Sequence, residues 1–276
     1  MIQSTRSTAY ETTPGRDHAD EYLEEVRNDH LGLVGGSSAM VALRDLIRRV
    51  AQSARPVLIS GPSGSGKSLV ADAIHRLGTW GPKGSEAGPL IRVSCLETGE
   101  QDLERVLFGS ESHPGLLAAS RGATLVLDDV NALSEGLQAK MVRLLQTGAF
   151  RPIGSSVERR VSIRVLAVTN RSLARCVREN TFRADLLYEL GVLTVPVPGL
   201  DEHRDDIPAL VNHFLRLGPS DTRFSADALD VLTGRSWPGA VRELRNLVER
   251  AVIQASEHVI SKGATQALIA PAWPPC

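Results

Sequence analysis

The stretch GPSGSGKS, at residues 61–68, constrains the fold of this chain more than any other part of the sequence. The apolar run PVLIS precedes it, and the helical pattern KSLVADAIHRL begins within it. Glycines at positions 61, 64 and 66 let the backbone curl with its N–H groups turned inward, and the helix presents its positive end to an anion. A strand, followed by glycines and a Lys-Ser pair at this spacing and then by a helix, is typical of a P-loop.

The P-loop spacing predicts a site for the phosphates of a nucleotide. The lysine of such a loop reaches the outer phosphates, and the hydroxyl of the next residue can bind Mg²⁺. We therefore expect Lys67 to bind phosphate and Ser68 to bind the metal. The alternative is a plain Gly/Ser turn. The residues of this loop predicted to bind the nucleotide are Gly61, Pro62, Ser63, Gly64, Ser65, Gly66, Lys67 and Ser68.

Strand-like and helical patterns alternate through the middle of the chain. The strand-like runs are at residues 56–60, 90–94, 124–128 and 163–168, and helical runs follow them at 67–77, 100–108, 135–146 and 173–188. Repeated β-then-α order predicts an α/β fold, a parallel sheet flanked by helices with its sites at the carboxyl ends of the strands.

Helical patterns also flank this region on both sides. From residue 39 the spacing predicts an amphipathic helix, with Val41 on the apolar face and Arg44 on the polar face. After a proline-rich break at 195–200, patterns at 206–215, 226–232 and 240–255 predict a small all-helical lid. The expected division is a flexible leader at 1–30, a nucleotide-binding α/β domain at 31–200, a helical lid domain at 201–268 and a tail at 269–276.

Composition excludes several classes of protein. A net charge of -1 gives no broad attraction to nucleic acid or to an anionic membrane. Three widely spaced cysteines argue against a disulfide framework and a zinc site, and no run of apolar residues is long enough to span a membrane. The amino terminus has no apolar signal region. We therefore expect a cytoplasmic protein.

Two neighbouring acids, Asp128 and Asp129, end the apolar run at 124–128. A carboxylate at a strand end near a P-loop can hold Mg²⁺ through water, which is the role that we expect for Asp128. Asp129 would then lie beside the attacking water. The alternative is that both side chains cap the helix that begins a few residues later.

Several blocks of the sequence together resemble the AAA+ domain of bacterial enhancer-binding proteins, the ATPases that remodel RNA polymerase carrying sigma-54. The resemblance covers about residues 31–268 and rests on GPSGSGKS, GATLVLDD, VLAVTNRSL, FRADLLYEL and WPGAVRELRNLVERAVI, in that order. It implies a ring-forming ATPase that uses ATP and Mg²⁺. It also implies that Asn170 senses the γ-phosphate, that Arg242 in the lid reports bound nucleotide, and that Arg183 is offered to the adjacent subunit. The alternatives are a helix cap for Asn170 and surface charges for the two arginines.

The chain departs from that family at positions on the hydrolysis pathway. Only SESH stands where the family has a loop tipped with GAFTGA that grips the sigma factor. Asp129 replaces a glutamate, Glu189 replaces an interface arginine, and Ser94 replaces an asparagine. A shift of about 1 Å in a catalytic group can cost about 100-fold in rate, and an arginine finger is worth about 10³–10⁵. We therefore expect slow hydrolysis.

Two principal hypotheses follow from the resemblance and its departures. The chain is a slow ATPase that forms rings and acts in transcription control, with RNA polymerase or a sigma factor as its partner. Alternatively, it is a nearly inactive ATP-binding subunit that joins rings of an intact AAA+ relative. A third hypothesis keeps the AAA+ core but assigns it to another complex. The sequence also predicts no DNA-binding domain of its own, because no helix-turn-helix follows the lid.

Overall fold

The structure is a computed structural model that describes residues 31–78, 88–97, 99–119, 122–218, 221–255 and 257–269. The predicted leader at 1–30 lies outside the described residues, as does the predicted tail at 269–276 except for its first residue. Within the described part of the chain, no helix has the length and apolar character needed to cross a membrane.

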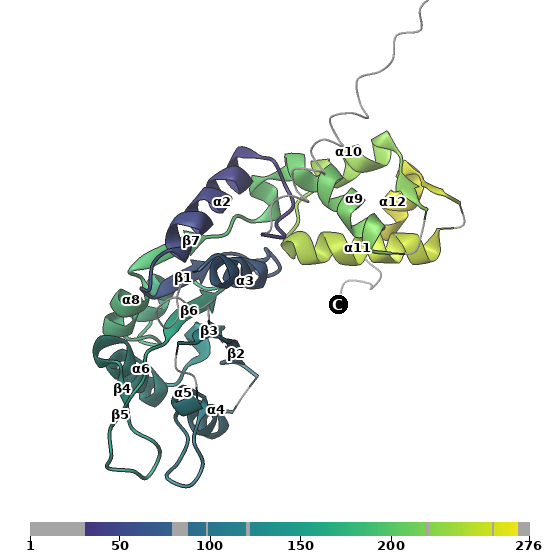
Figure 1. Cartoon of the computed structure of the whole chain (residues 1–276). Helices are drawn as coiled ribbons and strands as arrows, with labels where there is room; N and C mark the ends of the chain where they lie inside the picture. The colour runs from purple at the N-terminus through teal and green to yellow at the C-terminus, as the bar shows by residue number, and fades with distance from the viewer. Residues whose placement is uncertain are drawn as a thin grey trace, which may run out of the picture.

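A five-stranded parallel sheet forms the centre of the molecule (Figure 1). Its order is β2-β3-β6-β1-β7, and every pairing in it is parallel. The carboxyl ends of all five strands therefore lie along one edge, which confirms the predicted α/β fold with a parallel sheet. The strands are β1 (Val57–Ser60), β2 (Leu90–Ser94), β3 (Thr124–Asp128), β6 (Arg164–Thr169) and β7 (Leu193–Pro196).

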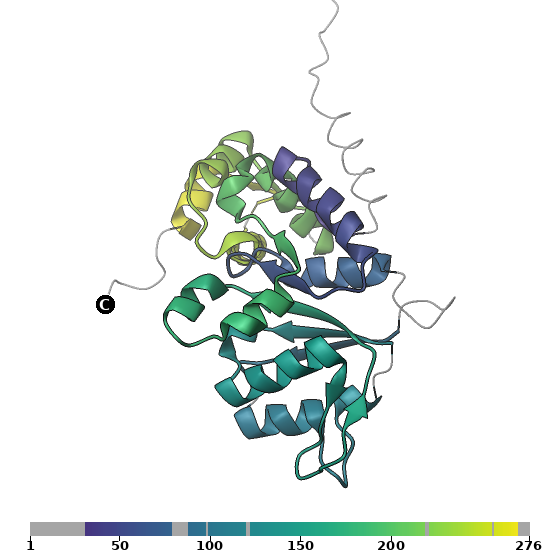
Figure 2. The ribbon, with the colours of Figure 1, turned by 90° about the vertical axis from the view of Figure 1, so that its left-hand side faces the viewer.

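Helices cover both faces of this sheet because the side chains of its strands alternate between two cores. Val126 of β3 packs in one core with α2 and α3, whereas Leu125 and Leu127 pack in the other with α4, α6 and α8. Figures 1 and 2 show α2 on the side of the sheet nearer the lid and α6 on the opposite side. These helices are α2 (Ser38–Ala51), α3 (Lys67–Leu77), α4 (Glu100–Phe108), α5 (Leu116–Ala119), α6 (Glu135–Thr147), α7 (Leu173–Arg178) and α8 (Ala184–Leu190).

The lid packs around a third core, which includes the buried side chain of Trp237 and is joined by Val34 from the segment before α2. The indole Nε1 of Trp237 donates to the carbonyl oxygen of Leu232 at 2.9 Å, so its one polar atom is satisfied. The lid was predicted to be all helical. It is mainly helical, but two short strands also pair in parallel within it. Its elements are η2 (Leu200–Glu202), η3 (Arg204–Asp206), α9 (Ile207–Leu217), β8 (Arg223–Phe224), α10 (Ala226–Gly234), α11 (Ala240–Gln254), β9 (Val259–Ile260) and α12 (Lys262–Ile269).

The prediction of a proline-rich break at residues 195–200 was wrong for its first two residues, whereas residues 197–199 belong to no helix or strand. Residues 193–196 form β7, which pairs with β1 at the edge of the sheet. Proline lacks the N–H that a central strand would need, but an edge strand tolerates it, and Pro196 is the last residue of β7. The single helical pattern predicted at 173–188 is likewise two helices, α7 and α8, separated by a turn in which Asn180 has φ 55°.

The prediction of a polar position for Arg44 was also wrong. Its side chain is buried, and its guanidinium donates to the carbonyl oxygens of Leu33, at 2.8 Å, and Gly35. These bonds tie α2 to the segment before it. Val41, predicted on the apolar face of the same helix, is instead exposed. The helix begins at Ser38, one residue before the predicted start, and the Ser37 hydroxyl caps it.

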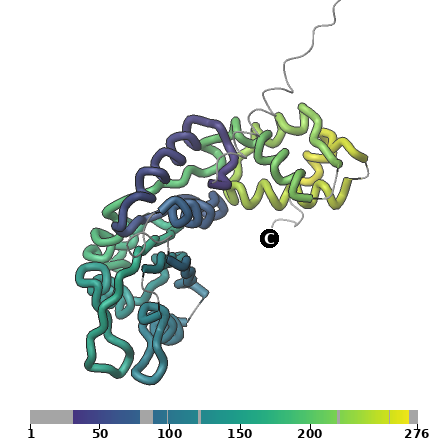
Figure 3. Tube along the Cα trace, viewed as in Figure 1, coloured from purple at the N-terminus to yellow at the C-terminus, as the bar shows by residue number. Residues whose placement is uncertain are grey.

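The segment SESH forms a closed turn at the end of the sheet domain that lies away from the lid. Ser110 N donates to His113 O at 2.8 Å, and Gly109 bridges to Pro114. A small hairpin of β4 (Ala149–Phe150) and β5 (Arg159–Arg160) extends beside this turn (Figure 3). Ile153 N in the hairpin donates to Gly109 O at 2.9 Å. The sequence patterns did not predict this hairpin.

Candidate nucleotide-binding site

The predicted P-loop lies where expected, between the end of β1 and the start of α3. Gly64 has φ +78° and Gly66 has φ +91°, backbone conformations that residues with a Cβ rarely adopt. A Cβ on Gly64 would also overlap the carbonyl oxygen of Gly239 in the lid. The glycines are therefore needed both for the curl of the loop and for the close approach of the lid.

The loop presents donors suited to an anion. Among the residues that the structure describes, no side chain caps the N-terminus of α3, so the first N–H groups and the positive dipole end of this helix are open to another partner. The Ser65 hydroxyl is buried and makes no hydrogen bond within the described part of the chain. A Cβ on Gly66 would meet only open space. These features fit phosphate oxygens as the missing acceptors.

Lys67 connects the loop to the other predicted site residues. Its ammonium donates to the carbonyl oxygens of Gly61, at 3.0 Å, and Pro62, at 2.6 Å. Burial lowers the pKa of Lys67, the charge of Asp129 opposes this, and Arg242 adds to the lowering. Asp129 from the sheet edge and Arg242 from the lid are therefore both near enough to Lys67 to influence its pKa.

Asp128 ends β3 at the carboxyl edge of the sheet, as predicted. Its Oδ2 accepts a hydrogen bond from Arg92 Nη1 at 2.9 Å. Arg92 Nη2 donates to Asp72 Oδ1 at 2.8 Å and lies 3.4 Å from the carbonyl oxygen of Ser68. Burial alone would lower the pKa of Arg92, but the hydrogen bond and charge of Asp128, together with Asp72, outweigh it and raise this pKa.

Sequence reasoning missed Arg92 as a site residue. The available signal was its position in LIRVS, where a charged side chain interrupts an apolar strand two residues before the carboxyl edge. A charge at that place in a parallel sheet points to a partner at the edge.

Asp129 stands in the left-handed region, with φ 52° and ψ 48°. Its side chain makes no capping hydrogen bond to the short helix η1 (Val130–Ala132), and the cap of α6 is Ser134. The capping alternative for the acid pair therefore has no support. Ser94 is paired with Asp128 in the sheet register, and its hydroxyl accepts from Glu97 N at 3.2 Å.

Cys95 is buried next to Asp128, and its backbone N–H donates to Asp128 O at 2.9 Å. Burial, with the charges of Asp128 and Asp129, raises the pKa of Cys95 to about 12. A thiol with this pKa stays protonated at neutral pH and is a poor nucleophile or metal ligand. Among the described residues, no group of three or more His, Cys, Asp or Glu side chains is arranged to hold a metal ion.

Asn170 follows β6 directly and is exposed at the same edge of the sheet. It does not cap α7, because the Ser172 hydroxyl does so, accepting from Arg175 N at 3.3 Å. Because β6 lies between β1 and β3, Asn170 emerges between the P-loop and the acid pair. That position suits the predicted contact with a terminal phosphate.

Arg242, near the start of α11, faces the P-loop rather than solvent alone. Its backbone N–H donates to Gly64 O at 3.2 Å, and its Nη1 lies 3.4 Å from the Ser63 hydroxyl. The lid thus touches the loop through the residue that the resemblance assigns to nucleotide sensing.

The structure does not join Arg183 to this cluster. Arg183 precedes α8, and its guanidinium makes two hydrogen bonds to Asp185, at 3.0 and 2.8 Å. On the same helix, Glu189 accepts from Gln146 at 3.0 Å. Helix α8 packs against α6 and α7, so both side chains belong to a different part of the surface. A role in an adjacent subunit's site stays a prediction.

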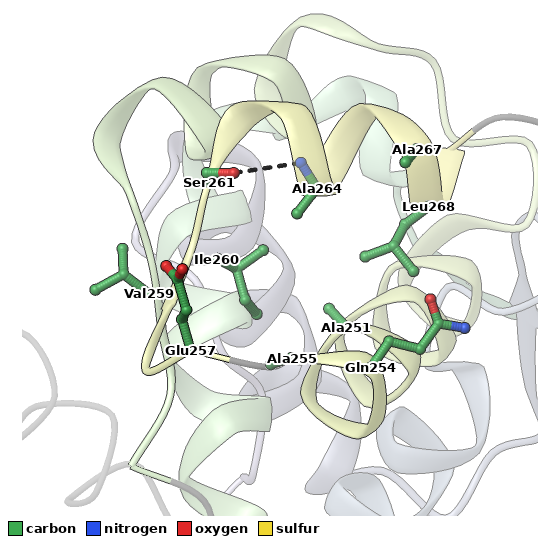
Figure 4. A pocket seen from close by; sticks show the side chains of 10 residues that line it. All are labelled: Ala251, Gln254, Ala255, Glu257, Val259, Ile260, Ser261, Ala264, Ala267 and Leu268. Carbon is green, nitrogen blue, oxygen red and sulfur yellow. Dashed lines mark hydrogen bonds between the residues drawn. The ribbon is translucent and has the colours of Figure 1, made fainter.

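A separate hollow of about 320 Å³ lies in the lid between α11, β9 and α12 (Figure 4). It contains no part of the P-loop, and small or apolar side chains form much of its wall. The Ser261 hydroxyl accepts from Ala264 N at 3.3 Å there, which caps α12. Its lining residues are Ala251, Gln254, Ala255, Glu257, Val259, Ile260, Ser261, Ala264, Ala267 and Leu268.

Solved structures with a similar fold include NtrX from Brucella abortus. The structure of NtrX in complex with ATP matches with a TM-score of 0.80 and 34% identity, covering 94% of this chain and 60% of that one. The structure of NtrX in complex with ADP matches with a TM-score of 0.77 and 34% identity, covering 90% and 58%.

Relatives of known sequence point to the same family. The chain is 40% identical over 242 residues to the nitrogen fixation protein AnfA of Azotobacter vinelandii, covering 83% of this chain and 44% of AnfA. It is 38% identical over 243 residues to the transcriptional regulatory protein GlrR of Escherichia coli K12, covering 83% and 54%. The chain thus spans about half the length of these relatives.

Family models match almost all of the described residues. The model of the sigma-54 interaction domain matches residues 33–196, and the model of the AAA+ ATPase lid domain matches residues 201–274. The resemblance predicted from short blocks of sequence is therefore confirmed over both parts of the fold. The chain belongs to the sigma-54 interaction domain family of AAA+ proteins.

Proposed function

We propose that this chain binds ATP and Mg²⁺ at residues 61–68 and hydrolyses ATP slowly, as a subunit of a ring that acts in transcription control. The observation that carries the proposal is the convergence of Lys67, the Asp128–Asp129 pair and Arg242 around the P-loop. The relatives add support, since NtrX has been solved with ATP and with ADP, and GlrR is a transcriptional regulatory protein.

Each residue of the cluster has a distinct role in this proposal. The curled loop and the N-terminus of α3 donate N–H groups to phosphate oxygens, and Lys67 adds a positive charge. Ser68 and Asp128 would hold Mg²⁺, which neutralises charge on the phosphates when bound. Asp129 positions the attacking water, Asn170 contacts the γ-phosphate, and Arg242 couples the nucleotide to the lid.

Slow turnover is part of the proposal because two catalytic positions differ from the family pattern. Asp129 is one methylene shorter than the family's glutamate, and water must lie about 2.6–3.2 Å from the group that polarises it. Glu189 would place a negative charge where the family offers an arginine to the neighbouring subunit. Of the arginines that the family offers to the neighbouring subunit, Arg183 is then the one that this chain keeps.

Contact with RNA polymerase or a sigma factor would have to use a different surface from the family's projecting loop. In this chain that position holds the closed turn at 109–114, joined to the hairpin at 149–160. We therefore propose that the chain does not remodel sigma-54 complexes by that loop. Partners in the ring are further copies of this chain or an intact AAA+ relative.

A second candidate function is a nearly inactive subunit that binds ATP and modulates the rings of an intact relative. The substitutions at positions 129 and 189 favour it, because they affect hydrolysis and leave the P-loop complete. A third candidate keeps this core but serves a complex outside transcription. Recovery of RNA polymerase or a sigma factor with the protein from cells would exclude that third candidate.

The proposal is tested by calorimetry with Mg²⁺ and ATP, followed by phosphate release at rising protein concentration. The expected result is binding by the wild-type chain and none by Lys67→Ala. Slow release whose specific rate rises with concentration supports the ATPase, whereas release only after an intact relative is added supports the modulating subunit. A folded wild-type chain that binds no ATP would overturn all three candidates.

A further inference from the structure

Arg92 lies between two carboxylates at the edge of the sheet where the nucleotide site is proposed. One nitrogen of its guanidinium is 2.9 Å from Asp128 Oδ2, and the other is 2.8 Å from Asp72 Oδ1. Three separate elements contribute to this cluster: Arg92 comes from β2, Asp72 from α3 and Asp128 from β3. The sheet register and the packing of α3 therefore fix the arrangement.

The cluster is partly shielded from water. The side chains of Arg92, Asp72 and Asp128 are 32%, 35% and 21% exposed. Charge pairs at this depth are screened less than pairs on an open surface, and a guanidinium that bonds two carboxylates is held more firmly than one with a single partner. Arg92 is thus a positioned cation and not a freely moving surface charge.

This cation contacts a carboxylate that is proposed to hold Mg²⁺. Arg92 Nη1 is bonded to Asp128, and Arg92 Nη2 lies 3.4 Å from the backbone carbonyl oxygen of Ser68, whose hydroxyl is the other expected metal ligand. A carboxylate oxygen that accepts from a guanidinium has its negative charge already compensated. Bringing Mg²⁺ to the same carboxylate would place two cations side by side, which costs free energy.

We propose that Arg92 is a resident cation at Asp128 with which Mg²⁺ must compete, so that nucleotide binding by this chain depends only weakly on Mg²⁺. This inference rests on the proposed function, because it concerns the same nucleotide site. It adds a cause for slow turnover that is independent of positions 129 and 189. A metal that is weakly held at Asp128 cannot orient the phosphates as a fully coordinated one does.

Binding of metal and binding of nucleotide are thermodynamically linked. The ratio of the nucleotide Kd in EDTA to its Kd in Mg²⁺ equals the ratio of metal affinities for bound and free nucleotide. If Arg92 competes with the metal, this ratio is near one in the wild-type chain. Removing the guanidinium increases the ratio, because Asp128 becomes available to the metal.

The first experiment measures this ratio by calorimetry with a non-hydrolysable ATP analogue, in EDTA and in Mg²⁺. Arg92→Gln is expected to raise the ratio about fivefold or more, which corresponds to about 1 kcal/mol. Arg175→Gln is the matched control, since Arg175 of α7 pairs with Glu179 at the surface, and it is expected to leave the ratio unchanged. Loss of packing alone would weaken both Kd values equally, so an unchanged ratio in Arg92→Gln overturns the inference.

The second experiment needs no variant. Mn²⁺ is titrated into the wild-type complex with the same analogue, and bound metal is followed by electron paramagnetic resonance. The expected Mn²⁺ affinity is within about threefold of that of the free analogue, because Asp128 adds little. An affinity tenfold tighter would overturn the inference while leaving the proposed function standing. A wild-type chain that binds the analogue in neither buffer would overturn both.

Discussion

The backbone N–H of Arg242 donates a hydrogen bond to the carbonyl oxygen of Gly64 at 3.2 Å, and so the first turn of α11 rests on the P-loop. The same contact brings the Arg242 guanidinium to 3.4 Å from the Ser63 hydroxyl. The lid and the phosphate loop are thus in direct contact through a residue that carries charge. A change in the loop can be passed to the lid without an intervening element.

Replacing Arg242 by alanine is expected to weaken nucleotide binding about tenfold or more, because it would remove the proposed contact of the guanidinium with the phosphates as well as its contact with the loop. The backbone bond to Gly64 does not require the side chain, so thermal stability should change little. Calorimetry with ATP and a melting curve check the two expectations. Arg245→Ala is the control, since Arg245 lies on the same helix and pairs with Glu249 at the surface. Equal affinities for the two variants would refute the assignment.

The alternation of apolar strands with amphipathic helices made most of the fold predictable. The runs at 90–94 and 100–108 correspond to β2 and α4 with the predicted bounds. In these runs the spacing of the apolar residues agrees with the side of the element that is buried. The edge strand β7 was missed because Pro196, with Pro198 just after the strand, looks like a break when pairing partners are unknown. Arg44 was misplaced because helical spacing cannot show that two backbone carbonyls from an earlier loop accept its hydrogen bonds.

Part of the site, like part of the fold, could be predicted from the sequence. Local spacing was enough to place Lys67 and Asp128 at one edge of the sheet, because a P-loop and the end of a strand can each be recognised from a few neighbouring residues. The contact of Arg242 with the loop spans 179 positions along the chain and came only from resemblance. Arg92 was not predicted as a site residue because its partners lie on two other elements, 20 and 36 positions away in the sequence. No short sequence pattern indicates that these side chains are in contact.

Asp206 joins the lid to the start of the sheet domain, and its removal should destabilise the protein. Its carboxylate accepts from Gly36 N at 2.7 Å, Ser37 N at 3.0 Å and the Ser37 hydroxyl at 2.6 Å, and His203 Nδ1 lies 3.2 Å away. Asp206→Asn should lower the free energy of unfolding by about 2–4 kcal/mol at pH 7, because a buried acceptor becomes a donor. Urea unfolding measures this loss, and Asp230→Asn on the exposed face of α10 is the control.

The loss in Asp206→Asn should also depend on pH. Burial alone would raise the pKa of Asp206, but hydrogen bonds from His203 and Ser37 outweigh it and hold this pKa below the ordinary value of 3.8. A carboxyl whose pKa is depressed by folding stabilises the protein fully above about pH 3.8, and this contribution disappears as the pH falls through the folded value. The difference in the free energy of unfolding between wild type and variant should therefore become smaller as the pH falls below about 3.8. A difference that stays constant down to about pH 3 would contradict this prediction.

Lengthening the acid at position 129 tests whether one methylene limits hydrolysis. Asp129→Glu is expected to raise the rate of phosphate release roughly 10- to 100-fold, because the carboxylate would reach the attacking water. Glutamate fits the left-handed backbone at φ 52° less well than aspartate does, so the melting temperature should fall by a few degrees. Asp129→Asn, which keeps the shape and removes the charge, should bind ATP and release no phosphate. An unchanged rate of phosphate release in Asp129→Glu would show that the length of this side chain does not limit hydrolysis.

Glu189 tests the contribution of a neighbouring subunit. Its carboxylate accepts from Gln146 at 3.0 Å on the exposed side of α8, so an arginine can replace it without entering the core. Glu189→Arg should increase phosphate release at least tenfold at protein concentrations that favour rings, because a positive charge would replace a negative one at the position proposed to face the γ-phosphate of the neighbouring subunit. The increase should vanish on dilution to monomers, which separates it from any change within one subunit. Glu189→Gln, which only removes the negative charge, should give a smaller increase in phosphate release. If the two variants gave equal increases, repulsion by Glu189, and not a missing arginine, would limit phosphate release by the wild-type ring.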